Sequence, residues 1–384
     1  MTKKELAEIK RRFTLEHHNL TCIRGCYVNS QGQVISSFTR SLEGMAQEEA
    51  EKYLAIFKRT LSGELEQNLR AIDFPPETVM HSARHRLLMA LRDCALKDEE
   101  TVQAFFDAAR GAFAEGQEPD AHFLILLLHD GYDVPHRGQD GRRENDLSTE
   151  VFHYILCSVC PVKMTKPALI YDAGSNAFAN READWAVGMP EMGFLFPAFD
   201  ERAANIYSAV FYTKDTGLAH EEFTEAVFGA PPPMPAKMQK ESFQGILQSS
   251  LGDECSLEVV QTVHEQVMEK IEEQKAEKNR AEVPRMDSRE VAAILEDCGV
   301  TEEKRAAFEE AFDREFGTAS ALNVAAVSSP KQFQVRTPNV VIRVSPDRSD
   351  LLETRVIDGH PYILIRAEEG VEVNGVNVNI KGNE

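Results

Sequence analysis

The sequence lacks the long apolar segments that place a protein in or across a membrane. No run among its 384 residues approaches the ~18 consecutive apolar residues of a membrane-spanning helix. The first thirteen residues, MTKKELAEIKRRF, contain no apolar core of the kind that a secretory signal peptide requires. We therefore expect a cytoplasmic protein that makes no membrane contact.

The short motifs of common nucleotide and hydrolase chemistry are also missing. The sequence has no GxxxxGK(S/T) phosphate loop, no GxGxxG after a strand and no GxSxG nucleophile elbow. The segment HEEFT, which begins at His220, resembles the start of a zinc protease helix, but Thr224 stands where the second histidine is needed. These patterns predict neither a cofactor nor a metal ion.

Seven scattered cysteines give no disulfide or zinc framework. An odd number in a chain of this length is unlike a secreted disulfide scaffold, so we expect reduced thiols. Cys157 and Cys160 have CxxC spacing, but a zinc site needs four ligands, and Cys22 and Cys26 are distant in sequence and differently spaced. A strand over 155–160 would point the two thiols to opposite faces, which favours a buried structural pair.

Basic residues are scarce relative to acidic ones. Forty-two basic and sixty-three acidic residues give a net charge of −21. A charge of this sign repels nucleic acid phosphates and anionic lipid unless a local basic face overcomes it, and the sequence contains no such face of convincing size. The charge therefore disfavours a nucleic-acid partner.

The rest of the composition is that of an ordinary globular protein, with 42% hydrophobic and 27% charged residues. The length leaves room for two or three cores. We predict an α+β protein whose central antiparallel or mixed sheet, with flanking helices, occupies residues 1–229. A proline-rich connection over 230–236 follows, then an acidic helical region of two helical hairpins over 237–317 and a small β-module over 331–380.

The central sheet is expected mainly between residues 121 and 214. Residues 123–128 are six consecutive apolar residues, typical of a strand buried on both faces. Further strand-like segments lie at 152–157, 168–171, 178, 185–187 and 206–212, and residues 173–176 predict a hairpin turn. Successive strands without long intervening helices favour an antiparallel or mixed sheet.

Helices and hairpins are predicted around this region. Leu6, Ile9 and Phe13 share one face of an N-terminal helix that should dock on the fold, and a β-hairpin is expected over 22–38. Helical composition predicts helices over 47–68, 77–96 and 99–115. In the C-terminal module, Asp358-Gly359 predicts a tight hairpin turn.

Polar residues that could form a site follow the apolar run. His129, Asp130 and Asp133 supply the imidazole and carboxylates used in metal binding or in acid–base catalysis. On a strand, residues 129 and 130 face opposite sides, so they converge only if the chain turns at Gly131. Ordinary turn chemistry is the favoured interpretation. Arg202 is a weaker candidate for an anion contact, because Asp200-Glu201-Arg202 also reads as a turn with local pairing.

Several long strings resemble a known family. They are RGCYVN at 24–29, LLLHDGYDVP at 126–135, YILCSVCPV at 154–162, DWAVGMPEMGFLFPAFDERAANI at 184–206 and PDRSDLLETRVIDG at 346–359. In these strings the chain resembles a bacterial family known only as domain of unknown function 4317, which is common in Firmicutes. The resemblance follows the family's order and spans nearly the whole chain. The resemblance implies a cytoplasmic bacterial protein and carries over no catalytic or binding residue.

Two functional hypotheses remain open. The first is a non-enzymatic modular protein that acts through protein–protein contacts, as its acidic helices and missing catalytic motifs suggest. The alternative is an enzyme or small-ligand binder that uses the central sheet, with His129, Asp130 and Asp133 as metal or acid–base groups. Convergence of these three side chains in a cleft would favour the alternative.

Overall fold

The structure is a computed structural model that describes residues 1–15, 22–113, 121–137, 143–144, 151–230, 232–276, 284–318, 320–327, 332–367, 370–373 and 375–378. The chain divides into two compact units, Met1–Pro235 and Ala236–Glu384, here called unit 1 and unit 2. Several residues of the predicted elements lie outside the described residues: 114 and 115 of the helix over 99–115, 231 of the connection, 277–283 of the helical region, and 331, 368, 369, 374, 379 and 380 of the β-module.

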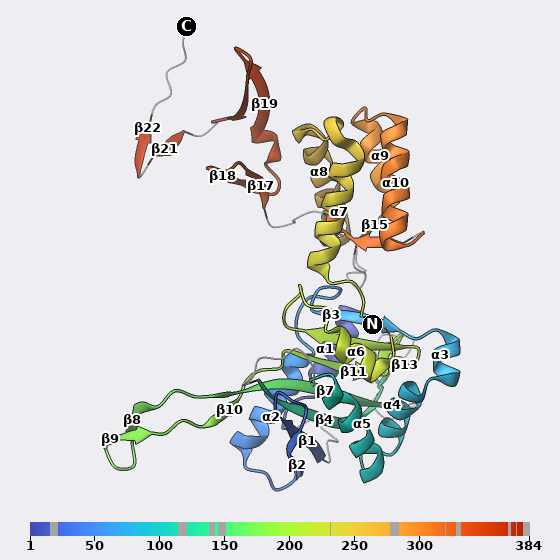
Figure 1. The fold of residues 1–384 in the computed structure, drawn as a ribbon, viewed down its shortest axis with the longest axis vertical. Helices are drawn as coiled ribbons and strands as arrows, with labels where there is room; N and C mark the ends of the chain where they lie inside the picture. The colour runs from blue at the N-terminus through green and yellow to red at the C-terminus, as the bar shows by residue number, and fades with distance from the viewer. Residues whose placement is uncertain are drawn as a thin grey trace. The chain divides into compact units, whose positions relative to one another are not determined.

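Unit 1 is built on one antiparallel sheet (Figure 1). Its main path has the order β2-β1-β4-β7-β11-β14-β3. The central pair, β4 and β7, stays in register from His122↔Val162 to Asp133↔Val151. In that order, the strands span Val34–Ser41, Cys22–Val28, His122–Asp133, Val151–Met164, Met192–Phe196, Ser208–Thr213 and Leu69–Asp73.

Helices cover both faces of this sheet, which explains why β4 is apolar on both sides. On one face, here called the α1 face, α1 (Lys3–Lys10) and α2 (Gln47–Thr60) pack on even-numbered β4 residues such as Leu126. On the other, the α5 face, α4 (Ala83–Asp93), α5 (Glu99–Gly111) and α6 (Glu221–Phe228) pack on odd-numbered residues such as Leu127.

Short elements complete unit 1. They are α3 (Pro76–His81), the pair β5 (His136–Arg137) and β6 (Arg143–Glu144), and the pair β12 (Ala198–Asp200) and β13 (Ala203–Asn205). Among the described residues of the whole chain, none of the helices combines the length and apolarity that a membrane crossing requires.

Residues 163–187 form an arm that projects from unit 1 as a two-stranded ribbon (Figure 1). The end of β7 pairs with β10 (Trp185–Val187), and farther out β8 (Ala168–Asp172) pairs with β9 (Ala177–Arg181). The same register runs along the whole arm, and the Thr165 amide joins the two ladders by donating to the Asp184 carbonyl at 2.8 Å. All residues of β8, β9 and β10 are exposed.

Unit 2 begins with helices packed around an apolar core that includes Phe243, Phe308 and Phe312. The helices are α7 (Ala236–Leu251), the short 3₁₀ helix η1 (Gly252–Glu254), α8 (Leu257–Ala276), α9 (Ser288–Asp297), α10 (Glu302–Phe316) and α11 (Val324–Val327). The short strands β15 (Arg285–Asp287) and β16 (Ala321–Asn323) pair beside them. Eighteen acidic and nine basic residues between 254 and 317 make this region acidic, as predicted.

The chain continues in unit 2 as separate two-stranded hairpins. The pairs are β17 (Phe333–Arg336) with β18 (Val341–Val344), β19 (Leu352–Ile357) with β20 (His360–Ile365), and β21 (Val371–Val373) with β22 (Val376–Val378); the 3₁₀ helix η2 spans Ser349–Leu351. Asp358 and Gly359 both have positive φ, at 50° and 78°, so the predicted tight turn is confirmed.

The prediction of an α+β fold with a central sheet is confirmed, and the sheet is antiparallel. The helix predicted over 47–68 is too long, because α2 ends at Thr60 and the chain then forms β3 against β14. The helix predicted over 77–96 is divided at Ser82, whose hydroxyl accepts a hydrogen bond from the His85 amide at 3.3 Å and caps α4. The predicted strands at 168–171 and 178 exist, but they pair only with each other in the arm.

One close packing contact gives a test of this fold. A Cβ atom at Gly193 would lie 2.2 Å from the Cys157 carbonyl oxygen and 2.7 Å from the Thr60 side chain. We expect Gly193→Ala to lower the free energy of unfolding by about 1–3 kcal/mol, because β11 must move away from β7. In Gly111→Ala, the control, the new methyl group meets nothing within 4 Å, and stability should hold or rise. Urea unfolding followed by circular dichroism compares them; equal stabilities would contradict the packing.

Candidate functional site

The three predicted site residues on β4 are divided between the two faces of the sheet. The strand does not turn at Gly131 but continues to Asp133, so alternation places Asp130 on the α1 face and His129 and Asp133 on the α5 face. Gly131 leaves room for a ring instead, because a Cβ atom there would lie 3.2 Å from His153. His129 and Asp130 therefore do not converge on one ligand.

Asp130 is fully buried and holds the end of α1 to the sheet. Its carboxylate accepts hydrogen bonds from Arg12 Nε at 2.6 Å, from Arg12 Nη2 at 3.1 Å and from the Tyr154 hydroxyl at 2.8 Å. The Arg12 guanidinium also lies over the Tyr132 ring, 4.8 Å from its centroid. Burial and the adjacent carboxylate raise the pKa of Tyr154 well above its usual value. Every oxygen of Asp130 thus has a partner from the chain.

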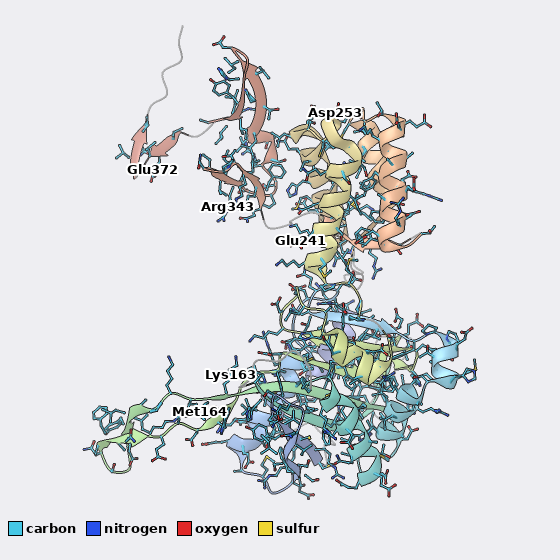
Figure 2. All side chains as sticks on the ribbon, viewed as in Figure 1. Lys163, Met164, Glu241, Asp253, Arg343 and Glu372 are labelled. Atoms are coloured by element: carbon cyan, nitrogen blue, oxygen red, sulfur yellow. The ribbon has the colours of Figure 1, made fainter. Side chains whose placement is uncertain are left out.

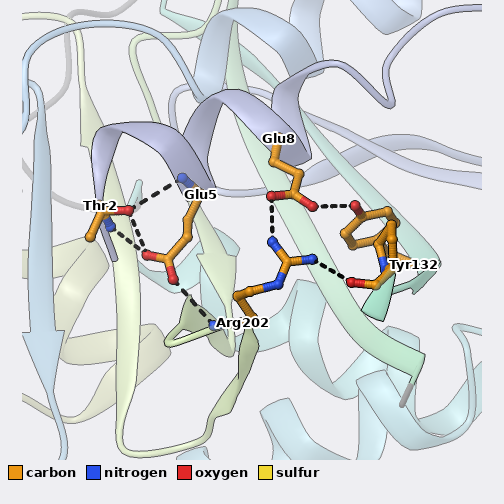
Figure 3. A network of polar contacts seen from close by, with 6 residues as sticks. Thr2, Glu5, Glu8, Tyr132 and Arg202 are labelled. Carbon is orange, nitrogen blue, oxygen red and sulfur yellow. Dashed lines mark hydrogen bonds and ion pairs between the residues drawn. The ribbon is translucent and has the colours of Figure 1, made fainter. Parts of the chain in front are cut away.

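Arg202 belongs to a second polar cluster under the same helix (Figure 3). Its Nη1 donates to Glu8 at 2.9 Å and its Nη2 to the Pro135 carbonyl at 3.1 Å, while its amide donates to Glu5 at 3.2 Å. The Tyr132 hydroxyl donates to the other oxygen of Glu8. Burial and this bond raise the pKa of Tyr132 to about 12. Arg202 therefore anchors α1 with contacts from within the chain.

His129 lies in a different environment on the α5 face. Only 9% of the residue is exposed, and its Nε2 atom is buried without a hydrogen-bond partner in the described part of the chain. Its ring stacks on that of His153 with centroids 5.5 Å apart. Burial, followed by the charge of His153, lowers the pKa of His129 to about 4. The imidazole is consequently neutral at physiological pH.

The positions of Asp133, Cys157 and Cys160 do not favour metal binding or redox chemistry. Asp133 is exposed at the end of β4. In the described ranges, no three His, Cys, Asp or Glu residues lie close enough together to hold a metal ion. Cys157 and Cys160 point to opposite faces of the sheet, as predicted. Burial raises the pKa of Cys160 to about 12 and that of Cys157 well above its usual value, so both remain thiols.

Among the described residues of unit 1, the large apolar side chains with the highest exposed fractions lie on the arm. It leaves the sheet at Lys163 and Met164 (Figure 2). Leu169 is 74% exposed and Phe178 is 73% exposed, and both lie near the tip. Tyr171 and Phe178 form a cross-strand pair whose ring centroids are 5.7 Å apart. Such side chains, collected on a projecting ribbon, are typical of a contact surface.

A pocket of about 430 Å³ lies at the base of the arm. Its wall includes Tyr53 and Ile56 from α2 and Leu124 from β4. Val187, the last residue of β10, and Met189, just beyond that strand, complete it. Nearby, Trp185 is 44% exposed and stacks on His122, with ring centroids 4.3 Å apart. The wall is mainly apolar, and Glu49 and Lys52 are its charged members.

Comparison with known proteins adds one positive finding. The family model described as "Domain of unknown function (DUF4317)" matches residues 1–376. The chain belongs to this family. No curated protein and no solved structure matches it. The family description names no activity, so the match assigns no catalytic or binding residue to this chain.

Sequence reasoning missed the arm because it assigned β8 and β9 to the central sheet, whereas the predicted strand at 185–187, β10, does extend that sheet by pairing with β7. One usable signal is present in β9 and β10, where Ala177, Ala179 and Ala186 alternate with larger residues. The buried middle of β4 instead carries Leu or Ile at every position from 124 to 128. Alanine on one side of a strand indicates that this side packs against little.

The buried ion pair under α1 can be tested directly. We expect Asp130→Asn to lower the free energy of unfolding by about 3–5 kcal/mol, because Arg12 would keep a charge without its partner in a mostly buried place. Asp133→Asn, at an exposed position of the same strand, should change stability by less than about 0.5 kcal/mol. Calorimetric unfolding of both variants measures the difference.

A double variant separates the ion pair from other effects of the substitution. Arg12→Met with Asp130→Leu removes both charges and should recover part of the stability lost in Asp130→Asn. An Asp130→Asn protein as stable as the wild type would refute the role assigned to this carboxylate.

Proposed function

We propose that the protein is a cytoplasmic bacterial protein that acts through protein–protein contacts made by its arm, without catalytic chemistry of its own. The observation that carries this proposal is the exposure of Leu169, Tyr171 and Phe178 on a ribbon that projects from unit 1. An isolated two-stranded ribbon is marginally stable in water, because it has no third strand or helix to cover an apolar face. A partner that covers this face would stabilise it.

The charges of the arm favour a protein partner over a nucleic acid. Its three basic residues, Lys163, Lys166 and Arg181, are balanced by three acidic ones, Asp172, Glu182 and Asp184. A phosphate backbone would meet no net positive charge on the arm and a net charge of −21 on the whole chain. Apolar and aromatic side chains with balanced charges suit a protein surface instead.

A photo-crosslinking amino acid placed at Phe178 in the producing cell tests the proposal. We expect discrete crosslinked protein adducts from position 178, because the side chain would lie inside a protein contact. The matched control is Met80 on α3, which is 63% exposed and lies away from the arm in sequence. Absence of adducts at 178, or the same adducts from both positions, would argue against arm-mediated contacts.

A second candidate function is binding of a small anion beside His129, and the buried, unpartnered Nε2 atom favours it. Besides His153, the cations Lys97 and Arg92 lie close enough to lower the pKa of His129 further, although Asp130 acts in the opposite direction. The connection that carries Lys97 is strained, since Ala95 and Leu96 have φ values of 51° and 58°. Arg24 holds it by donating to the Leu96 carbonyl at 3.0 and 2.9 Å.

Inorganic phosphate serves as the probe for this second candidate. An unpartnered buried nitrogen destabilises the free protein by about 1–3 kcal/mol, so His129→Leu should unfold at a higher temperature than the wild type. Phosphate should raise the unfolding temperature of the wild type but not of His129→Leu. His81→Leu, an exposed histidine in the same unit, should keep the response to phosphate. Equal phosphate effects in all three proteins would exclude the site.

A further inference from the structure

Unit 1 contains two apolar surfaces that none of its described residues covers. One is the arm tip, where Leu169, Tyr171 and Phe178 lie on the same face of the ribbon with the uncharged Asn180. The other is the pocket at the arm base, lined in part by Val187 and Met189. Both surfaces are apolar and carry few charges, so each could bury the other without leaving charged groups unpaired.

The arm cannot bring its own tip to its own pocket. One register runs from Val162↔Val187 at the base to Asp172↔Ala177 at the tip, so the ribbon is extended throughout. At about 3.3 Å per residue, the tip lies roughly 26 Å from the pair Met164↔Trp185. Two arms of equal length that lie antiparallel around a two-fold axis place each tip beside the base of the other arm. A second copy therefore brings a tip to each pocket.

Charge also favours a second copy at this place. Two chains that each carry −21 repel one another over most of their surfaces. The arm is an exception because its acidic and basic residues balance, and the pocket has one charge of each sign, from Glu49 and Lys52. Both surfaces thus have a net charge of zero, and their contact is spared the net repulsion between the two chains.

We propose that two copies of the chain exchange arms, so that the tip of each arm, with Phe178 and Leu169 at its centre, fills the pocket beside Met189 of the other copy. This inference rests on the proposed function and names its partner as the same chain. The exchange is reciprocal, so the two contacts are identical and the assembly closes as a dimer. Because the contact is apolar, added salt should leave the dimer intact or strengthen it.

Sedimentation velocity of the full chain tests the exchange. We expect the wild type to sediment as a dimer at micromolar concentration. Phe178→Lys places a charge on the arm tip, and Met189→Asp places a charge in the pocket. Each variant alone should sediment as a monomer. Met80→Asp, the matched control at an exposed apolar position on α3, should remain a dimer. Circular dichroism should show that all the variants fold, since the altered side chains are exposed.

Mixing the two broken variants distinguishes exchange from other dimers. In a mixed pair, the intact tip of the Met189→Asp chain meets the intact pocket of the Phe178→Lys chain. At the second contact, the introduced lysine faces the introduced aspartate. The mixture should therefore form dimers that neither variant forms alone. A dimer that joins two tips would stay broken in the mixture, because one of its tips would still carry lysine.

Three outcomes would overturn the inference: a monomeric wild type, dimers from either single variant, or a mixture that remains monomeric. If the wild type is a monomer and position 178 crosslinks to a different protein, the arm exchange is refuted but the proposed function is supported. A monomeric wild type without adducts at position 178 would end both. A small apolar molecule that occupies the pocket in a monomer would equally overturn the exchange.

Discussion

The pairing of β4 with β7 is the constraint on which the rest of unit 1 depends. These two strands are the longest of the sheet, and both are buried on both faces over most of their length. A slip of one residue would exchange the side chains of the two faces and expose two cores at once, so the register is strongly fixed. Once it is fixed, the partners of every polar residue on these strands follow.

This register explains why the neighbouring polar residues His129 and Asp130 lie in different environments. It places Asp130 on the α1 face, where Arg12 compensates its charge, and it places His129 on the α5 face, where Nε2 has no hydrogen-bond partner in the described part of the chain. The ion pair adds directional hydrogen bonds at the end of α1 to the apolar packing of Leu6 and Ile9. The same geometry prevents a joint acid–base site.

The class of fold could be predicted from the sequence because alternation, apolar runs and turn residues are local signals. The run at 123–128 and the turn at Asp358-Gly359 are examples, and both correspond to what the structure contains. The strand β3 could not be predicted from Leu69, Arg70 and Ala71, since these residues also suit a helix and only pairing with β14 decides between the two.

The polar contacts were even harder to predict from the sequence than the strands. Opposite placement of His129 and Asp130 follows from strand alternation, but whether Gly131 turns the chain depends on its partner strand, which supplies the ring of His153. The partner of Asp130 is 118 residues away in sequence, and no local pattern points to Arg12. The arm escaped prediction because its strand and turn residues carry the same signal in a ribbon as in a sheet, and only the alanines of β9 and β10 distinguish the two.

The position of Trp185 has a consequence for how the protein can be observed. It is the only tryptophan of the chain, and it lies at the base of the arm, partly exposed, with its ring stacked on His122. All tryptophan fluorescence therefore originates from this one place. Its emission wavelength depends on whether water or protein surrounds the indole, so the chain carries a built-in optical reporter of the arm base.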